Sequence, residues 1–219
     1  YEALDLDLQR NVALKVLTPA YSKKPKVRSR FHNEARIGAI LDHPNICPIY
    51  GVGFTESDCP FIAMKKVDGV ALDEIIDDLK DGKDGVAEEY PFSKRVELIA
   101  QAAQGMAFAH SLGVIHRDLK PANVMVDGRG RVRITDFGLA KKVQKTSAST
   151  RPRSRGSASY LSPEEERGES VSARTDLFML GLTLWEALVG SHPYEEGRDL
   201  DKEPSLARWA RRRLLANER

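Results

Sequence analysis

Cysteine is scarce in this sequence, and its scarcity excludes one class of small protein. Cys47 and Cys59 are the only two cysteines among the 219 residues, whereas a secreted fold held by a disulfide framework needs more than one pair. Neither cysteine has further ligands at the spacing of a zinc site. We therefore expect two ordinary thiols in a reducing compartment, with the cytoplasm as the location.

Long apolar runs and a large net charge are absent as well. The most apolar stretch, residues 177–189, contains Glu186 and is shorter than the roughly 20 residues that a helix needs to cross a bilayer. We expect no membrane segment in these residues, which leaves open that they are the cytosolic part of a membrane-anchored protein. The 34 basic and 32 acidic side chains nearly cancel to a formal charge of +2, so no long-range field favours nucleic acid as a partner.

The sequence does contain a change of pattern near residues 67–69. Before it, apolar residues cluster or alternate as in short strands, with one helical segment between them; after it, helical spacing dominates. A hairpin is predicted in the second part, because two apolar runs flank residues 127–130, Asp-Gly-Arg-Gly. The other predicted strands are 3–8, 11–17, 46–54 and 61–67, and the predicted helices are 28–41, 72–79 and 93–112.

Two motifs carry oxygen-bearing side chains at a spacing that suits phosphoryl transfer. The first is HRDLKPAN, from His116 to Asn123, and the second is Asp136-Phe-Gly, with the predicted hairpin between them. Phosphoryl transfer needs a carboxylate near the attacking hydroxyl and hard oxygen ligands for Mg²⁺. Asp118 can serve the first need, and Asn123 and Asp136 the second. An isolated Asp-Phe-Gly would indicate only a turn, but its combination with HRD at this separation indicates catalysis.

With these motifs, residues 1 to about 194 resemble the protein kinase superfamily, in particular the eukaryotic-like (Hanks-type) serine/threonine kinases of bacteria. The resemblance implies an α+β, two-lobed protein kinase fold, with a small antiparallel-sheet N-lobe and a mainly helical C-lobe, both incomplete. It implies that residues 1–67 form the N-lobe and residues 68–195 the C-lobe. Residues 196–219 are a basic tail that does not match.

The same resemblance implies an ATP site between the lobes. Lys15 would hold the α- and β-phosphates and pair with Glu34 on a helix. Because an unpaired buried charge is costly, a partner is expected for this lysine, the alternative being that it extends to solvent. Asn123 and Asp136 would hold Mg²⁺, with Mn²⁺ as a further candidate. The adenine would contact Ala13, Met64, Lys65, Val67 and Met125, through backbone hydrogen bonds at Lys65 and Val67.

Two residues imply serine or threonine as the acceptor. Lys120 would contact the transferring phosphate, and Ser157, in a segment that resembles the end of a kinase activation loop, would bond the catalytic Asp118 and Lys120. Both features are typical of the serine/threonine branch of the family.

Three further residues would support the catalytic loop. Asp176 would brace the loop backbone from the following helix, with an ordinary helix N-cap as the alternative, and Glu164 would close the activation segment. Arg117 carries a charge that a phosphate on the activation loop would neutralise. The candidate phosphorylation sites are Thr146, Ser147, Ser149 and Thr150.

The sequence departs from the family pattern in three places. No Gly-rich phosphate loop precedes Tyr1, and residues 196–219 do not match the closing helices, so we expect a catalytic domain truncated at both ends and weakly active or inactive as this stretch alone. Gly38 stands where kinases have a bulky apolar residue. A gap at that position would loosen the helix that carries Glu34.

The leading functional hypothesis is transfer of the ATP γ-phosphate to serine and threonine hydroxyls of protein substrates. One alternative is a pseudokinase or scaffold that binds nucleotide or partners without phosphotransfer. Another is a phosphotransferase for small molecules that shares the fold. The sequence predicts neither the physiological substrate nor the oligomeric state.

Overall fold

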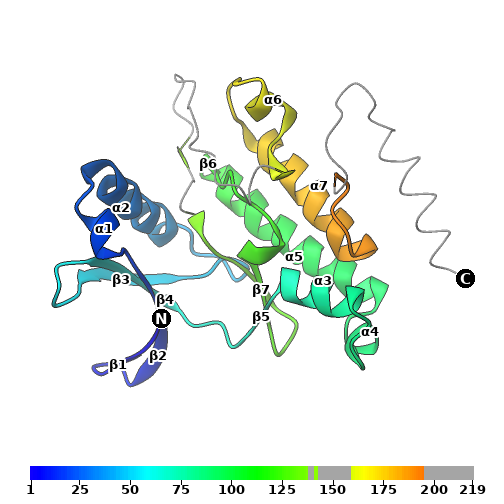
Figure 1. The fold of residues 1–219 in the computed structure, drawn as a ribbon, viewed down its shortest axis with the longest axis horizontal. Coiled ribbons are helices and arrows are strands. Elements are labelled where there is room, and N and C mark those ends of the chain that lie inside the picture. Colours follow the sequence, from blue (N-terminus) through cyan, green and yellow to red (C-terminus); the bar gives the residue numbers. More distant parts are fainter. Residues whose placement is uncertain (138–140, 143–158, 195–219) are drawn as a thin grey trace, which may run out of the picture.

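The computed structural model describes residues 1–137, 141–142 and 159–194, with backbone only at 141–142. The first part, called the N-lobe here, is a four-stranded antiparallel sheet with two helices beside it (Figure 1). Its strands lie in the order β1-β2-β4-β3. The elements are β1 (Glu2–Asp5), β2 (Arg10–Val16), α1 (Pro19–Ser22), α2 (Pro25–Ala39), β3 (Ile49–Phe54) and β4 (Pro60–Lys65).

The first strand is shorter than its alternating pattern predicts. β1 ends at Asp5, whose carboxylate accepts a hydrogen bond from the Leu8 backbone N–H at 3.1 Å and so closes a turn. Leu6 and Leu8 are 73% and 63% exposed, so the alternation there does not mark a buried face. The predicted strand over 3–8 is therefore wrong beyond Asp5.

Helix α2 packs on the sheet through small and apolar side chains. Phe31 and Ala35, four residues apart on one helix face, join Ile62 of β4 in a small buried core. Gly38 continues this face, and a Cβ added to it would overlap the Cδ1 atom of Ile49 and lie 3.0 Å from its Cγ1 atom. Ile49 of β3 thus occupies the space beside Gly38, and the gap predicted there is not present.

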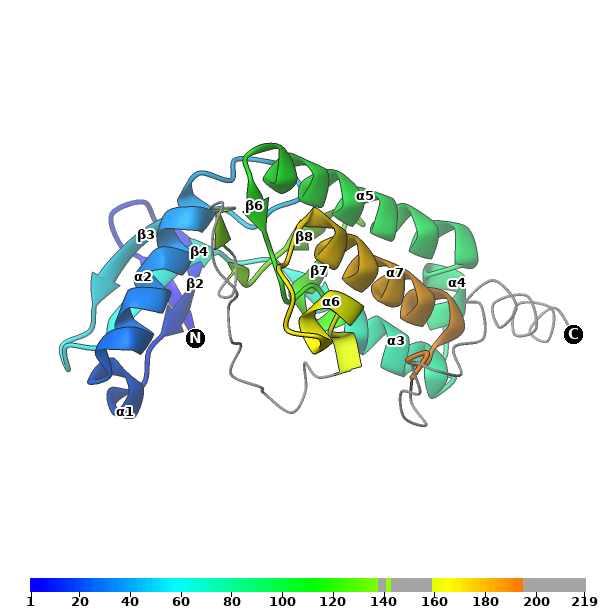
Figure 2. The same ribbon diagram turned by 90° about the horizontal axis from the view of Figure 1, so that it is seen from above.

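The second part, called the C-lobe here, is mainly helical. The long helices α5 and α7 run side by side in both views (Figures 1 and 2). One large buried core, which includes Leu72, Met106 and Met179, holds these helices together. The elements are β5 (Gly69–Ala71), α3 (Leu72–Lys80), α4 (Val86–Glu89), α5 (Phe92–Ser111), β6 (Val114–Ile115), the 3₁₀ turn η1 (Pro121–Asn123), β7 (Val124–Asp127), β8 (Val132–Ile134), β9 (Lys141–Lys142), α6 (Pro163–Glu166) and α7 (Ala173–Val189).

The predicted hairpin is confirmed and lies where the lobes meet. β7 and β8 pair antiparallel, with Val126 opposite Val132, and β5 adds to them in the order β5-β7-β8. The chain segment before β3 also reaches this sheet, because Ile134 N–H donates to the Asn45 carbonyl at 2.8 Å and Cys47 N–H donates to the Ile134 carbonyl at 2.9 Å. The predicted α+β, two-lobed architecture is confirmed. Within the described residues, no helix is both long and apolar enough to span a membrane.

Candidate active site

Lys15 lies at the centre of an ion cluster that joins the two lobes. It lies on β2, opposite Ile62 of β4, and its ammonium group is 2.7 Å from Glu34 Oε1 on α2 and 2.7 Å from Asp136 Oδ1, which follows β8. The Lys15 side chain is 37% exposed and the Glu34 side chain 8%. The structure therefore brings together the lysine, the helix glutamate and one of the two metal-ligand candidates, and Lys15 does not extend away to solvent.

The electrostatics of this cluster keep Lys15 charged. Burial alone would lower the pKa of Lys15, but the carboxylates of Asp136 and Glu34 outweigh it and raise the pKa above its ordinary value of 10.5. Burial raises the pKa of Glu34 above its ordinary value of 4.5, and the attraction of Lys15 opposes that shift only in part. A buried carboxylate of this kind is stable in its charged form only while its cation stays in place.

Asp118, Lys120 and Asn123 gather in the loop that follows β6. Lys120 Nζ donates to Asp118 Oδ2 at 3.2 Å, and Asn123 Nδ2 donates to the Asp118 carbonyl at 2.7 Å. Asp118 and Lys120 are largely buried, with side chains 13% and 24% exposed. Because the amide nitrogen of Asn123 is used within the loop, its amide oxygen is the atom that remains to bind a cation.

His116 ties this loop to the segment that carries Asp136. Its Nδ1 atom accepts a hydrogen bond from the Asp118 N–H at 3.2 Å, so Nε2 carries the hydrogen and donates it to the Thr135 carbonyl at 3.0 Å. Its ring also packs against the ring of Phe137 in a T-shaped arrangement, with ring centroids 4.5 Å apart. Arg117 and Asp136 both have positive φ, of 70° and 60°. Such conformations cost non-glycine residues of order 1–3 kcal/mol and cluster at functional sites.

Asp176 holds the backbone of the catalytic loop from helix α7. The residue is fully buried. Its two carboxylate oxygens accept hydrogen bonds from the backbone N–H groups of His116 and Arg117, each at 2.8 Å, and from His110 Nε2 at 2.7 Å. The alternative that Asp176 caps the helix is wrong, because the N-cap of α7 is Ser172.

The sequence analysis missed one residue at this site, Glu165. Its Oε1 atom is 3.9 Å from the Arg117 guanidinium, and the two side chains are 5% and 6% exposed. Its Oε2 atom accepts from the Ser162 hydroxyl at 3.3 Å, in the capping box that starts α6. The signal was available as Ser-Pro-Glu-Glu at 162–165, because a serine followed three residues later by glutamate is typical of that cap. Glu164, the neighbour that was singled out instead, accepts from Thr175 Oγ1 at 2.6 Å.

The residues proposed around the adenine come from both lobes. Ala13 lies opposite Met64 in the β2-β4 pair, and Met125 lies opposite Ala71 in the β5-β7 pair. The N–H of Lys65 donates to the Pro48 carbonyl at 2.9 Å, and its carbonyl oxygen accepts from the Cys47 thiol at 3.4 Å. Val67 follows in the connection between the lobes, and its N–H makes no hydrogen bond to any described residue. The Val67 N–H therefore remains as a donor for a ligand, and the second lone pair of the Lys65 carbonyl as an acceptor.

A few predicted residues cannot be placed at the site. Ser157 and the four phosphorylation candidates, Thr146, Ser147, Ser149 and Thr150, lie outside the described residues, as does the tail 196–219.

The donor chemistry of Asn123 and Asp136, an amide oxygen and a carboxylate, fits Mg²⁺ or Mn²⁺. In the part of the chain that the structure describes, no three His, Cys, Asp or Glu side chains converge to hold a metal.

Two lobes joined by a lysine-carboxylate cluster, above a loop that carries Asp118 and Asn123, define a protein kinase domain. The family model described as "Protein kinase domain" matches residues 1–213, and the chain belongs to this family. Two of its relatives, both from bacteria, illustrate the similarity. The chain is 39% identical over 196 residues to serine/threonine-protein kinase PknB of Mycobacterium leprae and 35% identical over 217 residues to serine/threonine-protein kinase PrkC of Bacillus subtilis. The predicted resemblance to the Hanks-type serine/threonine kinases of bacteria is therefore confirmed.

The coverage of these matches differs between the chain and its relatives. The match to PknB spans 88% of this chain but 30% of the relative, and the match to PrkC spans 95% and 32%. The chain therefore spans about a third of the length of these relatives. Among solved structures, the kinase domain of PknI from M. tuberculosis matches with a TM-score of 0.66 and 26% identity, over 93% of this chain and 72% of that one.

Proposed function

We propose that the protein is a serine/threonine protein kinase that transfers the γ-phosphate of ATP to hydroxyl groups of protein substrates. The observation that carries the proposal is the contact of Lys15 with Glu34 and Asp136, at 2.7 Å each. It joins the lobes at the point where phosphates would lie, and His116 connects it to Asp118. The relatives named as serine/threonine-protein kinases support the acceptor class.

The described side chains can divide the chemistry of the transfer among them. Asp118 would orient the substrate hydroxyl and accept its proton as the oxygen forms a bond to the γ-phosphorus and the bond to the β-phosphate oxygen breaks. Lys120, held beside Asp118, and Lys15 would neutralise charge on the transferred and the remaining phosphates. Asn123 and Asp136 would hold Mg²⁺ or Mn²⁺, which neutralises phosphate charge when bound.

No observation favours the alternatives. A pseudokinase is expected to lack one of Lys15, Asp118 or Asp136, and all three are present and lie close to their expected neighbours. A phosphotransferase for small molecules is disfavoured because the matched relatives are named as protein kinases. For the whole protein we propose a cytoplasmic catalytic domain, with protein substrates and ATP as its partners.

The test is transfer of radiolabelled phosphate from ATP to a generic basic protein by the full-length product. We expect Asp118→Asn to lower the rate roughly 10²- to 10⁴-fold, because proton transfer contributes about that much. The melting temperature of the variant should stay close to that of the unchanged protein, because the side chain keeps its size. Asp77→Ala, at an exposed position of α3, is the matched control and should keep full activity. Equal transfer by the protein and by Asp118→Asn would refute the proposal.

A further inference from the structure

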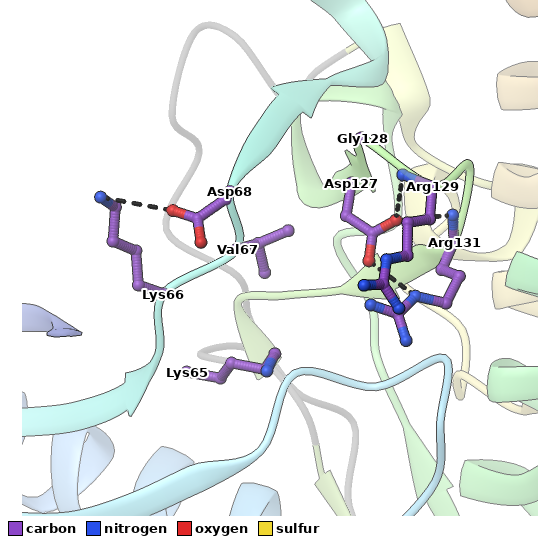
Figure 3. Close-up of a pocket in the computed structure, with 8 residues that line it drawn as sticks. All are labelled: Lys65, Lys66, Val67, Asp68, Asp127, Gly128, Arg129 and Arg131. Carbon is purple, nitrogen blue, oxygen red and sulfur yellow. Dashed lines mark hydrogen bonds and ion pairs between the residues drawn. The ribbon is translucent and has the colours of Figure 1, made fainter. Parts of the chain in front are cut away.

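A cavity lies beside the connection between the lobes, and its lining includes Lys65 and Val67, the two residues proposed to meet the adenine through backbone atoms. Its volume is about 380 Å³, and Figure 3 shows its two walls. One wall is the end of β4 and the connection that follows, and the other is the turn between β7 and β8. The lining residues are Lys65, Lys66, Val67, Asp68, Asp127, Gly128, Arg129 and Arg131.

Backbone contacts fix the two walls relative to each other. Gly69 lies opposite Asp127 in the β5-β7 pair, and Gly128 N–H donates to the Asp68 carbonyl at 3.3 Å. A Cβ at Gly69 would overlap the carbonyl oxygen of Val126, so only glycine allows this close approach. The cavity is therefore formed by backbone segments in fixed positions, and its shape does not depend on long side chains alone.

Two of the four cations in the cavity are neutralised by neighbouring carboxylates. Arg131 Nε is 2.8 Å from Asp127 Oδ2. Lys66 Nζ is 2.6 Å from Glu2 Oε1 and 3.3 Å from Asp68 Oδ1. These pairs stabilise the walls and leave little charge for a ligand.

The other two cations, Lys65 and Arg129, have no carboxylate within ion-pair distance among the described residues. One lies on each wall (Figure 3). Because side chains alternate along a strand, Lys65 faces away from the side on which its neighbour Met64 packs against the N-lobe core. The cavity thus presents two cations of unneutralised charge across a gap, away from Ala13 and Met125, which do not line it.

We propose that this cavity is a docking site for an acidic segment of the protein substrates. The proposal rests on the proposed function, because it assigns the anion to a protein that also supplies the acceptor hydroxyl. Carboxylates a few residues apart on an extended segment would contact Lys65 on one wall and Arg129 on the other. Charge complementarity of this kind favours the matching partner and speeds its encounter. The site would raise the local concentration of the acceptor.

The test measures binding alone, by fluorescence anisotropy of a labelled peptide that contains six glutamates and no serine, threonine or tyrosine. We expect saturable binding by the full-length protein that weakens as salt is raised. Arg129→Glu should weaken it roughly threefold to tenfold, since exposed ion pairs are of modest strength and the substitution both removes a cation and adds a repulsive charge. ATP, which would meet Lys65 and Val67 through backbone atoms only, should not displace a peptide held by the Lys65 and Arg129 side chains.

The matched control is Arg30→Glu, a reversal of an exposed cation on α2 at the edge of a different basic hollow. It should leave the peptide affinity unchanged. Absence of saturable binding, or equal weakening by Arg129→Glu and Arg30→Glu, would overturn the proposal. The proposal would also be overturned if a labelled oligonucleotide bound more tightly than the peptide and Arg129→Glu abolished that binding, because the site would then serve nucleic acid. The assay contains neither ATP nor an acceptor, so failure of docking is distinguishable from failure of the kinase reaction.

Discussion

Replacement of Asp176 by alanine is expected to destabilise the whole protein and to disorganise its catalytic loop. The carboxylate is fully buried and accepts hydrogen bonds from the backbone N–H groups of His116 and Arg117 and from His110. A hydrogen bond to a charged group contributes about 1.5–3 kcal/mol. Loss of the two backbone bonds alone should therefore cost about 3–6 kcal/mol, a large part of the roughly 5–15 kcal/mol by which a domain is stable.

Urea unfolding followed by circular dichroism measures this cost. With a urea dependence of about 2–3 kcal/mol per molar, the midpoint should fall by about 1–3 M. Asp176→Asn keeps one acceptor oxygen and places an amide N–H₂ where an acceptor is needed, so we expect an intermediate loss. Both variants should lose kinase activity at temperatures where they are still folded, because the Asp118 backbone follows directly after the two bonded amides.

Asp77→Ala provides the comparison, since it removes an exposed aspartate from α3 and should change stability by no more than about 0.5 kcal/mol. If Asp176→Ala shifts the urea midpoint no more than Asp77→Ala does, the reasoning is wrong. Retention of full activity by the folded Asp176→Ala variant would show that the brace does not position the loop.

Three further predictions concern Gly38, Glu165 and Cys47. Gly38→Leu should cost about 1–3 kcal/mol of unfolding free energy through overlap with Ile49, and Ile49→Ala in the same chain should recover part of it; no recovery would argue against that contact. Glu165→Lys should cost about 3–5 kcal/mol, because it replaces the buried carboxylate beside Arg117 by a second cation. Glu165→Gln, which keeps its capping hydrogen bonds, should cost less, and equal losses in urea unfolding would contradict the charge argument. Burial raises the pKa of the Cys47 thiol to about 11 from its ordinary value of 9.0. Because the folded protein holds the thiol proton more tightly than the unfolded chain does, this thiol contributes its full stabilisation below pH 9 and loses it between pH 9 and 11. The unfolding free energy of the unchanged protein should therefore fall between pH 9 and 11, and Cys47→Ala should remove up to about 2–3 kcal/mol of that fall. Urea titrations of both proteins at pH 9 and pH 11 measure it, and an equal fall in the two proteins would refute the prediction.

Local pattern predicted most of the helices and strands. The helix predicted over 93–112 is α5, Phe92–Ser111, and the strand predicted over 11–17 is β2, Arg10–Val16. Periodicity and turn residues determine such segments within a short window, which is why the β7-β8 hairpin was also found. The pairing of Lys15 with Glu34 could be anticipated from the resemblance to kinases and from the cost of an unpaired lysine in an apolar strand.

Contacts between residues far apart in the sequence could not be predicted from local pattern. Glu165 and Arg117 are far apart in the sequence, and neither the periodicity of α6 nor its cap indicates which cation the free carboxylate oxygen will approach. The filling of the space beside Gly38 depends on the rotamer of Ile49, on another element. The end of β1 at Asp5 is determined by a side-chain hydrogen bond to Leu8, which competes with the strand and leaves no trace in the apolar pattern.

The ammonium group of Lys15 has three N–H donors, and Glu34 of the N-lobe and Asp136 of the C-lobe each accept from it. Separation of the lobes must therefore pull one positive charge away from one of two negative charges. The free energy of opening then includes a Coulombic part that weakens as ions are added to the solvent. Access to the space between the lobes is in this sense controlled by the ionic composition of the surroundings as well as by the shape of the protein.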